Sequence, residues 1–384
     1  MDGEQTAGPR SGRQLLGNLV LALFVLACAL AAAEFAVRML YKNKTVLFPR
    51  YHTDYRYGDY TIRGIRPNAE FWHTSVDGTW KFVTNSRGFR NKREFTYAKP
   101  ANTLRVLSLG DSHTQGYEVH QDLTFSAVLE RYLKNHKINA EAINTGVSGF
   151  STAEELVLLE NEGVKYNPDV VVLGFFANDF EDNLKAGLFG LDAQNRLVDK
   201  KYEHVPGVGV QNFIYAIPGV PWLSENSYFY SLLFNNVWNY FKQLLAESAR
   251  KQAGSKEEPS TTAPFEYAVP TGAPISASQI ALTAALIERM HKFCEDRGIR
   301  FLLIDIPTLK TPYRYQSSLP PALAERLSKA HIEYISSEVL LKDFDGTAEI
   351  HRLHGDHHIT EFTHTLLGAE IGKRLIAGRN VKAQ

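Results

Sequence analysis

Cysteine is scarce in this chain, with two residues among 384, and methionine and tryptophan number three and four. Cys28 lies in an apolar run and Cys294 in a helical pattern, so we expect no disulfide bond. The cysteines therefore do not indicate a cellular compartment.

A surplus of charge is also lacking, because Lys plus Arg and Asp plus Glu each number 42. A protein that binds mainly nucleic acid usually carries a basic excess, so we expect no nucleic-acid partner. No internal repeat is apparent. Histidines are dense over residues 351–364, but they lack the helical i, i+4 spacing and the nearby cysteines of zinc sites. We therefore expect no metal ion.

Residues 15–33 contain no charged side chain and are about long enough to span a bilayer, with Arg10 and Arg13 before them. We expect a polar tail over 1–14 and a transmembrane anchor helix over 15–40. A signal peptide cleaved after the alanines at 31–33 is one alternative, and a lipoprotein modified at Cys28 is another. Basic residues follow the span, and charge counting alone would place the chain after the span on the cytoplasmic side. A long folded domain can nevertheless be translocated despite such charges.

Most of the remaining chain alternates strand-like and helix-like segments. This rhythm predicts an α/β fold whose parallel sheet has helices on both faces. The expected strands are 104–109, 138–143, 170–176, 300–307 and 331–335, and the expected helices are 123–134, 152–163, 277–297, 320–329 and 363–377. Together they define one domain made of residues 101–183 and 276–380.

Two segments do not follow this rhythm. Residues 41–100 are predicted to form a small β-rich lead-in with strands at 69–73 and 80–84, whose aromatic side chains form either a core or a carbohydrate site. Residues 184–275 form an insertion with an aromatic helix over 228–245 and a mobile linker over 251–274. That helix could act as a lid, rest on the membrane, bind a membrane partner, or simply pack on the main domain.

The candidate nucleophile is Ser112, which follows the first buried strand in the sequence Gly110-Asp111-Ser112. A serine on a glycine-permitted turn at a strand end is where α/β folds present a nucleophile. Taken alone, this segment could also be an ordinary turn without a catalytic role.

Three later segments carry polar groups at similar positions. Gly149 lies in a glycine-containing turn after the second strand, and Asn178 follows the third strand, where its amide could donate to an oxyanion. Near the C-terminus, Asp356 and His358 flank one residue, so the carboxylate could orient an imidazole that takes the serine proton.

The order and content of these segments resemble the SGNH (GDSL-type) hydrolase superfamily. The resemblance covers roughly residues 103–376 and implies a flavodoxin-like three-layer α/β/α sandwich with a mostly parallel sheet. It implies Ser112 as nucleophile, His358 as general base and Asp356 as its orienting acid. It also implies an oxyanion hole made by the N–H groups of Ser112 and Gly149 and by the Asn178 amide. His113 departs from the family pattern, and His357 is the rival for the role of base.

The resemblance implies a membrane-anchored serine esterase that cleaves an acyl or acetyl O-ester, on an acylated glycan or lipid, without a cofactor. Anchored relatives place the catalytic domain in the periplasm or outside the cell, and we expect the same here. The alternative is an O-acyltransferase that modifies cell-surface polysaccharide, served by a membrane acyltransferase partner that donates the acyl group. A non-catalytic scaffold is the alternative from a different class.

Overall fold

The structure is a computed structural model that describes residues 12–47, 49, 51–200, 208–253, 274–311, 313–354 and 357–382. Most of the expected polar tail and residues 254–273 of the expected linker lie outside the described residues.

A five-stranded parallel sheet forms the centre of the molecule, in the order β13-β10-β7-β5-β6. The strands are β5 (Leu104–Gly110), β6 (Ala140–Asn144), β7 (Val170–Phe175), β10 (Arg300–Asp305) and β13 (Tyr334–Ile335). The expected parallel sheet is therefore confirmed. Every residue of β7 is buried, because a strand covered by helices on both faces has no solvent-exposed side.

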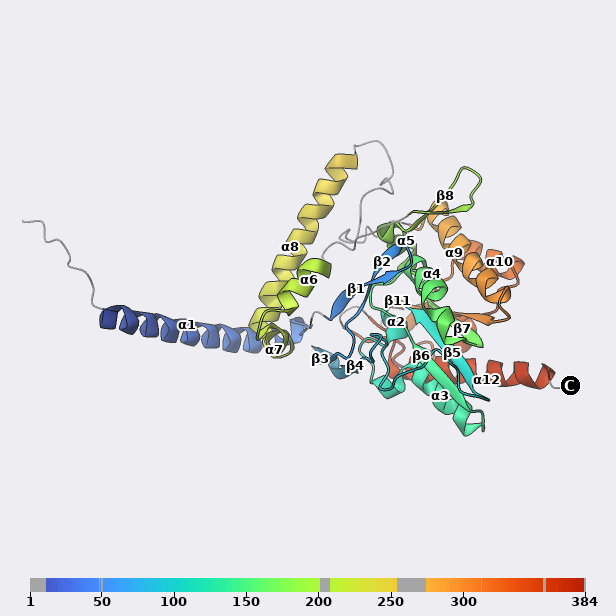
Figure 1. Cartoon of the computed structure of the whole chain (residues 1–384), viewed down its shortest axis with the longest axis horizontal. Helices are drawn as coiled ribbons and strands as arrows, with labels where there is room; N and C mark the ends of the chain where they lie inside the picture. The colour runs from blue at the N-terminus through green and yellow to red at the C-terminus, as the bar shows by residue number, and fades with distance from the viewer. Residues whose placement is uncertain are drawn as a thin grey trace, which may run out of the picture.

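Helices cover both faces of this sheet (Figure 1). On one face, α3 (Phe125–Asn135) and α12 (Glu361–Lys382) enclose a core with Val172 and Ile304. On the other face, α4 (Thr152–Asn161), α9 (Ala277–Glu295) and α10 (Pro321–Lys329) pack on Leu173 and Leu303. The alternation of side chains along each strand thus divides the core into two halves and produces the predicted three-layer sandwich.

The lead-in forms two hairpins rather than one. The predicted pair appears as β3 (Glu70–Ser75) and β4 (Gly78–Val83), and it is preceded by β1 (His52–Tyr57) and β2 (Tyr60–Ile65), which the sequence pattern did not reveal. Tyr51, Phe71 and Trp80 are buried in the same core as the sheet. These three aromatic side chains are therefore core residues, whereas Trp72 on β3 is exposed.

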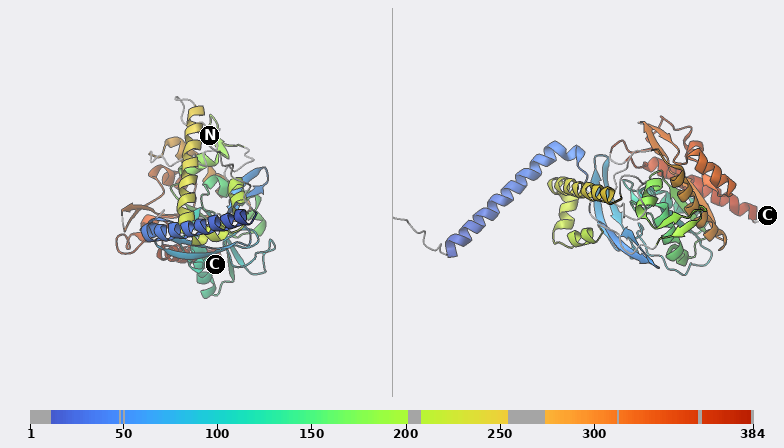
Figure 2. Two further views of the ribbon diagram at one scale, coloured as in Figure 1. Left: turned by 90° about the vertical axis from the view of Figure 1, so that its left-hand side faces the viewer. Right: turned by 90° about the horizontal axis from the view of Figure 1, so that it is seen from above.

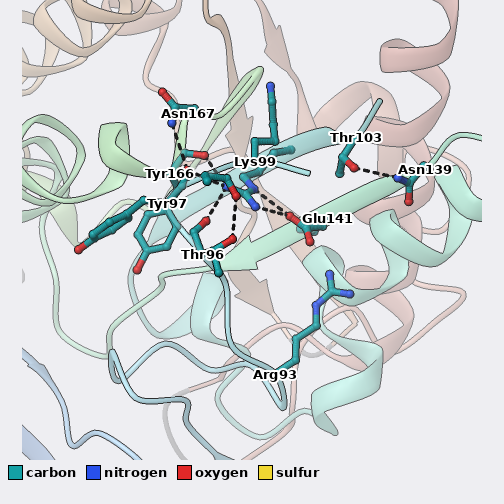
Figure 3. Close-up of polar contacts among 12 residues, drawn as sticks. Arg93, Thr96, Tyr97, Lys99, Thr103, Asn139, Glu141, Tyr166 and Asn167 are labelled. Atoms are coloured by element: carbon teal, nitrogen blue, oxygen red, sulfur yellow. Dashed lines mark hydrogen bonds and ion pairs between the residues drawn. The ribbon is translucent and has the colours of Figure 1, made fainter. Parts of the chain in front are cut away.

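A buried arginine at the start of β5 joins the lead-in to the sheet. The Arg105 guanidinium donates to the Glu141 carboxylate on β6 at 2.6 and 2.8 Å. It also donates to the carbonyl oxygens of Thr96 and Tyr166 at 2.9 and 2.7 Å. Figure 3 shows Thr96, Tyr166 and Glu141 gathered around this point. The chain entering the domain is thus tied to the strand that leads to the candidate nucleophile.

The N-terminal helix α1 (Gly12–Tyr41) projects away from the domain (Figures 1 and 2). Within the described residues it is the one helix long and apolar enough to cross a membrane, a property that a signal sequence shares. Near its end, the Glu34 carboxylate accepts hydrogen bonds from the Tyr228 and Phe229 backbone N–H groups and from the Ser227 hydroxyl. A carboxylate there neutralises the free N–H groups of a helix start.

The insertion that Glu34 contacts is more helical than expected. It contains α6 (Val208–Tyr215), α7 (Val220–Asn226) and α8 (Tyr228–Ala253), and α8 lies beside α1. Large apolar side chains of these helices face solvent, including Phe213, Trp222 and Tyr240. The remaining elements are short: η1 (Lys42–Lys44), α2 (Ser112–Gln115), η2 (Gln121–Leu123), η3 (Gly163–Tyr166), α5 (Asp179–Ala186), β8 (Phe189–Leu191), β9 (Leu197–Asp199), β11 (Thr308–Thr311), β12 (Arg314–Gln316) and α11 (Ser337–Leu341).

The turns after β5 and β6 lie against each other. The Val147 N–H donates to the Gly110 carbonyl oxygen at 3.0 Å. Gly146 approaches so closely that an added Cβ would lie 2.3 Å from the Gln115 backbone nitrogen. Only glycine permits this approach, which holds α2 in place.

Gly146→Ala should therefore destabilise the protein by about 1–3 kcal/mol and displace α2, because backbone atoms cannot give way as a flexible side chain can. Thermal unfolding of the full chain in detergent would measure this. Gly209→Ala is the matched control, since no atom lies within 4 Å of its added Cβ. Equal stabilities of the two variants would contradict the prediction.

Candidate active site

The turn at the end of β5 presents Ser112. Gly110 has a φ of +150°, and an added Cβ there would collide with the Thr114 side chain. Asp111 caps α2, since its carboxylate accepts a hydrogen bond from the His113 N–H at 2.8 Å. The strand thus turns sharply into α2, and Ser112 is the first residue of that helix.

The loop before α12 brings His358 to this serine. The His358 Nε2 atom lies 2.9 Å from the Ser112 Oγ atom, although 246 positions separate the two residues. The Arg352 N–H donates to the His358 carbonyl oxygen at 2.8 Å, and the Ile359 N–H donates to His113 Nδ1 at 3.4 Å. These contacts fix the backbone on both sides of the imidazole, so His113 serves as a support for the loop.

The neighbouring histidine has a different environment. His357 is exposed, has a φ of +55°, and places its Nδ1 atom 3.2 Å from the Arg352 carbonyl oxygen. Asp356, the expected orienting acid, lies outside the described residues. Of the two imidazoles, His358 is therefore the one that contacts Ser112.

The two other residues expected to form the oxyanion hole follow neighbouring strands of the sheet. Asn178 follows β7, and its amide nitrogen lies 3.3 Å from the Asp111 carboxylate, next to Ser112. Gly149 has a φ of +81°, and an added Cβ would lie 2.6 Å from the Arg63 guanidinium. Ser112, Gly149 and Asn178 thus follow the ends of β5, β6 and β7, the edge at which parallel α/β sheets bind ligands.

Several buried carboxyl groups surround the site. The sequence pattern did not single them out as functional residues. Burial raises the pKa of Asp111 to about 6, more than its hydrogen bonds lower it. Burial and the nearby Asp179 and Asp111 carboxyl groups raise the pKa of Glu155 well above its ordinary value. Glu118 differs because it faces two imidazoles: its Oε2 atom lies 3.7 Å from His358 Nδ1. No local pattern marks Glu118, because it lies in an irregular loop after α2.

The other histidines near the C-terminus have separate contacts. His351 Nε2 lies 2.7 Å from the Pro307 carbonyl oxygen, and His364 Nδ1 accepts a hydrogen bond from the Phe125 N–H. His354 contacts the Asp77 carboxylate. Within the described residues, no group of three or more His, Cys, Asp or Glu side chains is arranged to hold a metal ion.

A serine at the end of a strand in an α/β sheet, contacted by a buried imidazole, is typical of serine hydrolases. The comparison with known families identifies the group within that class. The model of the GDSL-like lipase/acylhydrolase family matches residues 108–323, and the chain belongs to this family of ester-hydrolysing enzymes. No curated protein matches the chain.

Solved structures similar to this chain include a lipase/acylhydrolase and two esterases. A lipase/acylhydrolase from Enterococcus faecalis has 16% identity and a TM-score of 0.38, covering 72% of this chain and 96% of its own. An acetyl-xylooligosaccharide esterase variant from Geobacillus has 10% identity and a TM-score of 0.36, covering 72% and 94%. A two-domain esterase active on acetylated mannans has 13% identity and a TM-score of 0.36, covering 73% and 50%.

His358→Ala should lower kcat/KM by at least about a hundredfold, because it removes the imidazole that contacts Ser112 Oγ, and His357→Ala should lower it less than about threefold. Ester hydrolysis by the two purified variants would measure the difference. If His357→Ala proved the more damaging change, the assignment of the base would be wrong.

Proposed function

We propose that the protein cleaves an O-ester through an acyl-enzyme on Ser112. The observation that carries this proposal is the 2.9 Å contact between Ser112 Oγ and His358 Nε2. A neutral imidazole at that distance can accept the hydroxyl proton as the oxygen attacks. The substrate class is an ester of an acyl or acetyl group, on a glycan or a lipid.

The reaction proceeds in two balanced steps. Ser112 Oγ bonds to the acyl carbon while its proton moves to His358 Nε2. The ester C–O bond then breaks, and the same proton goes to the departing alcohol. Water next attacks the acyl-enzyme, gives a proton to His358, and releases the acid as that proton returns to Ser112. The Ser112 and Gly149 N–H groups and the Asn178 amide hold the oxyanion in both steps.

The second candidate is transfer of the acyl group to a sugar hydroxyl in place of water. The apolar helix α1 and the exposed aromatic side chains of the insertion favour it, because they would bring the site near a membrane-bound acyl donor. The same residues serve both reactions. Comparing release to water with transfer to glycan acceptors, with and without membranes containing a donor enzyme, distinguishes them.

Ser112→Ala should abolish hydrolysis across an ester panel from acetyl to long acyl, lowering kcat by at least about a thousandfold. It should also abolish labelling by a fluorophosphonate probe while leaving the melting temperature unchanged, since Ser112 is partly exposed and its loss opens no core cavity. Ser328→Ala, on α10, is the control. Ester hydrolysis by Ser112→Ala at the rate of the unmodified enzyme would contradict the mechanism.

We also propose that α1 anchors the protein in a membrane, with the catalytic domain in the periplasm or outside the cell. The insertion then lies against the membrane surface, because α8 packs beside α1 and the exposed Phe213 and Trp222 side chains lie on the adjoining helices. Aromatic side chains are favoured at such interfaces.

The protein should accordingly remain in the membrane fraction after washing with high salt, because salt weakens charge-mediated attachment but not burial of an apolar span. N-terminal sequencing should find residues 1–33 still attached. A mature protein beginning near Glu34 would instead indicate a cleaved signal, and a lipid on Cys28 a lipoprotein. On intact cells, a membrane-impermeant fluorophosphonate should label Ser112.

A further inference from the structure

The second ring nitrogen of His358 faces a carboxylate other than the expected one. His358 Nδ1 and Glu118 Oε2 lie 3.7 Å apart, and both atoms are buried. Neither atom has a hydrogen-bond partner among the described residues. Two complementary polar atoms that are buried, unpaired and turned toward each other strongly favour closer contact, because each otherwise loses its hydration without compensation.

The backbone around Glu118 is held in an unusual conformation. Glu118 has a φ of +60°, which costs free energy for a residue with a side chain. The Arg90 guanidinium donates to the carbonyl oxygens of Gln115 and Val119 at 2.8 and 2.7 Å, on either side of Glu118. Arg352 donates to the Glu118 carbonyl oxygen at 3.1 Å. The surrounding contacts thus direct this side chain toward His358.

A second imidazole holds the other oxygen of the carboxylate. His73 Nε2, on β3, lies 3.6 Å from Glu118 Oε1, and the Tyr117 hydroxyl lies 3.2 Å from His73 Nδ1. Burial alone would raise the pKa of Glu118, but interactions with His358, His73 and Ser75 lower it well below its ordinary value. The pKa of Glu118 is thus shifted in the opposite direction from that of the buried acid Glu155, which keeps the Glu118 carboxylate ionised at neutral pH.

We infer that Glu118 is the positioning acid of His358, and that His73 fixes the orientation of the Glu118 carboxylate. This inference rests on the proposed function. The carboxylate holds the tautomer that carries a proton on Nδ1, which leaves Nε2 free to take the Ser112 proton. It also stabilises the imidazolium that forms. The Nδ1 to Oε2 distance of 3.7 Å shortens to a hydrogen bond as that positive charge develops.

Other ionisable or charged groups also act on His358. They lie on four segments: Asp111, His113 and Tyr117 at the turn after β5, His73 on β3, His351 and Arg352 in the loop before His358, and His364 on α12. Burial raises the pKa of Asp111 to about 6, so its carboxyl group is less completely ionised near neutral pH than that of Glu118. Asp356 is the alternative candidate for the acid that orients His358, so the experiment includes a variant at that position.

The experiment compares Glu118→Gln, Glu118→Asp and Asp356→Asn in the full-length enzyme. Glu118→Gln should lower kcat by roughly 10²–10⁴-fold with a small change in KM, because the amide cannot stabilise the imidazolium. The acidic limb of the pH profile of kcat/KM should move to lower pH by about one unit or more, since the anion that favours the protonated base is gone. Glu118→Asp keeps the negative charge, so its pH profile should lie close to that of the unmodified enzyme.

Glu361→Gln is the matched control, because Glu361 also contacts an imidazole, that of His120 at 2.5 Å, but outside the site. It should change neither kcat nor the pH profile. Melting temperatures and far-UV circular dichroism spectra show whether each variant is folded.

The inference is overturned if Asp356→Asn moves the acidic limb and lowers kcat by a hundredfold or more. This outcome decides the question even if Glu118→Gln fails to fold. An unchanged pH profile in folded Glu118→Gln overturns it as well. Failure of the proposed function looks different: the unmodified enzyme would then neither hydrolyse any ester nor react with the fluorophosphonate at Ser112.

Discussion

The geometry of the site depends on one buried guanidinium. Arg90 donates hydrogen bonds to the Gln115, Gly116 and Val119 carbonyl oxygens and stacks over the Phe82 ring at 3.8 Å. Burial lowers the pKa of Arg90 to about 9, which still leaves it charged at neutral pH. Its charge is balanced by backbone dipoles, and those carbonyl groups would otherwise lack partners at the end of α2. The nucleophile helix and the Glu118 loop are thus held from a single point.

The pKa values of the carboxyl groups near the site shift in opposite directions because their partners differ. Glu155 and Asp179 are fully buried among other acids, and burial raises the pKa of each well above its ordinary value. Glu118 is also buried, yet its two imidazole neighbours lower its pKa. The interaction that lowers the pKa of Glu118 lies on the Nδ1 side of His358, whereas Ser112 contacts Nε2.

Much of the fold could be predicted because buried parallel strands read as continuous apolar runs. β5, β7 and β10 begin at the predicted residues and end within two residues of the predicted ends. The β1–β2 hairpin was missed because one of its faces is exposed and its sequence mixes polar and aromatic residues.

The site was predictable only in part, for a related reason. Ser112, Asn178 and His358 lie next to recognisable strand ends or motifs, so their sequence context indicates their roles. Glu118 and His73 have no such context, because their relation to His358 arises from tertiary packing between β3 and the loop after α2. A pattern along the chain carries no information about that packing.

The residues that the family model matches are not all of the residues that make up the site. The matched region, residues 108–323, contains Ser112 and Glu118 but excludes Arg90, His73 and His358. The groups that support the nucleophile come from a segment before this region, and the imidazole comes from one after it. A fragment limited to residues 108–323 would therefore carry Ser112 without the imidazole that contacts it, and without the arginine that holds the turn after α2.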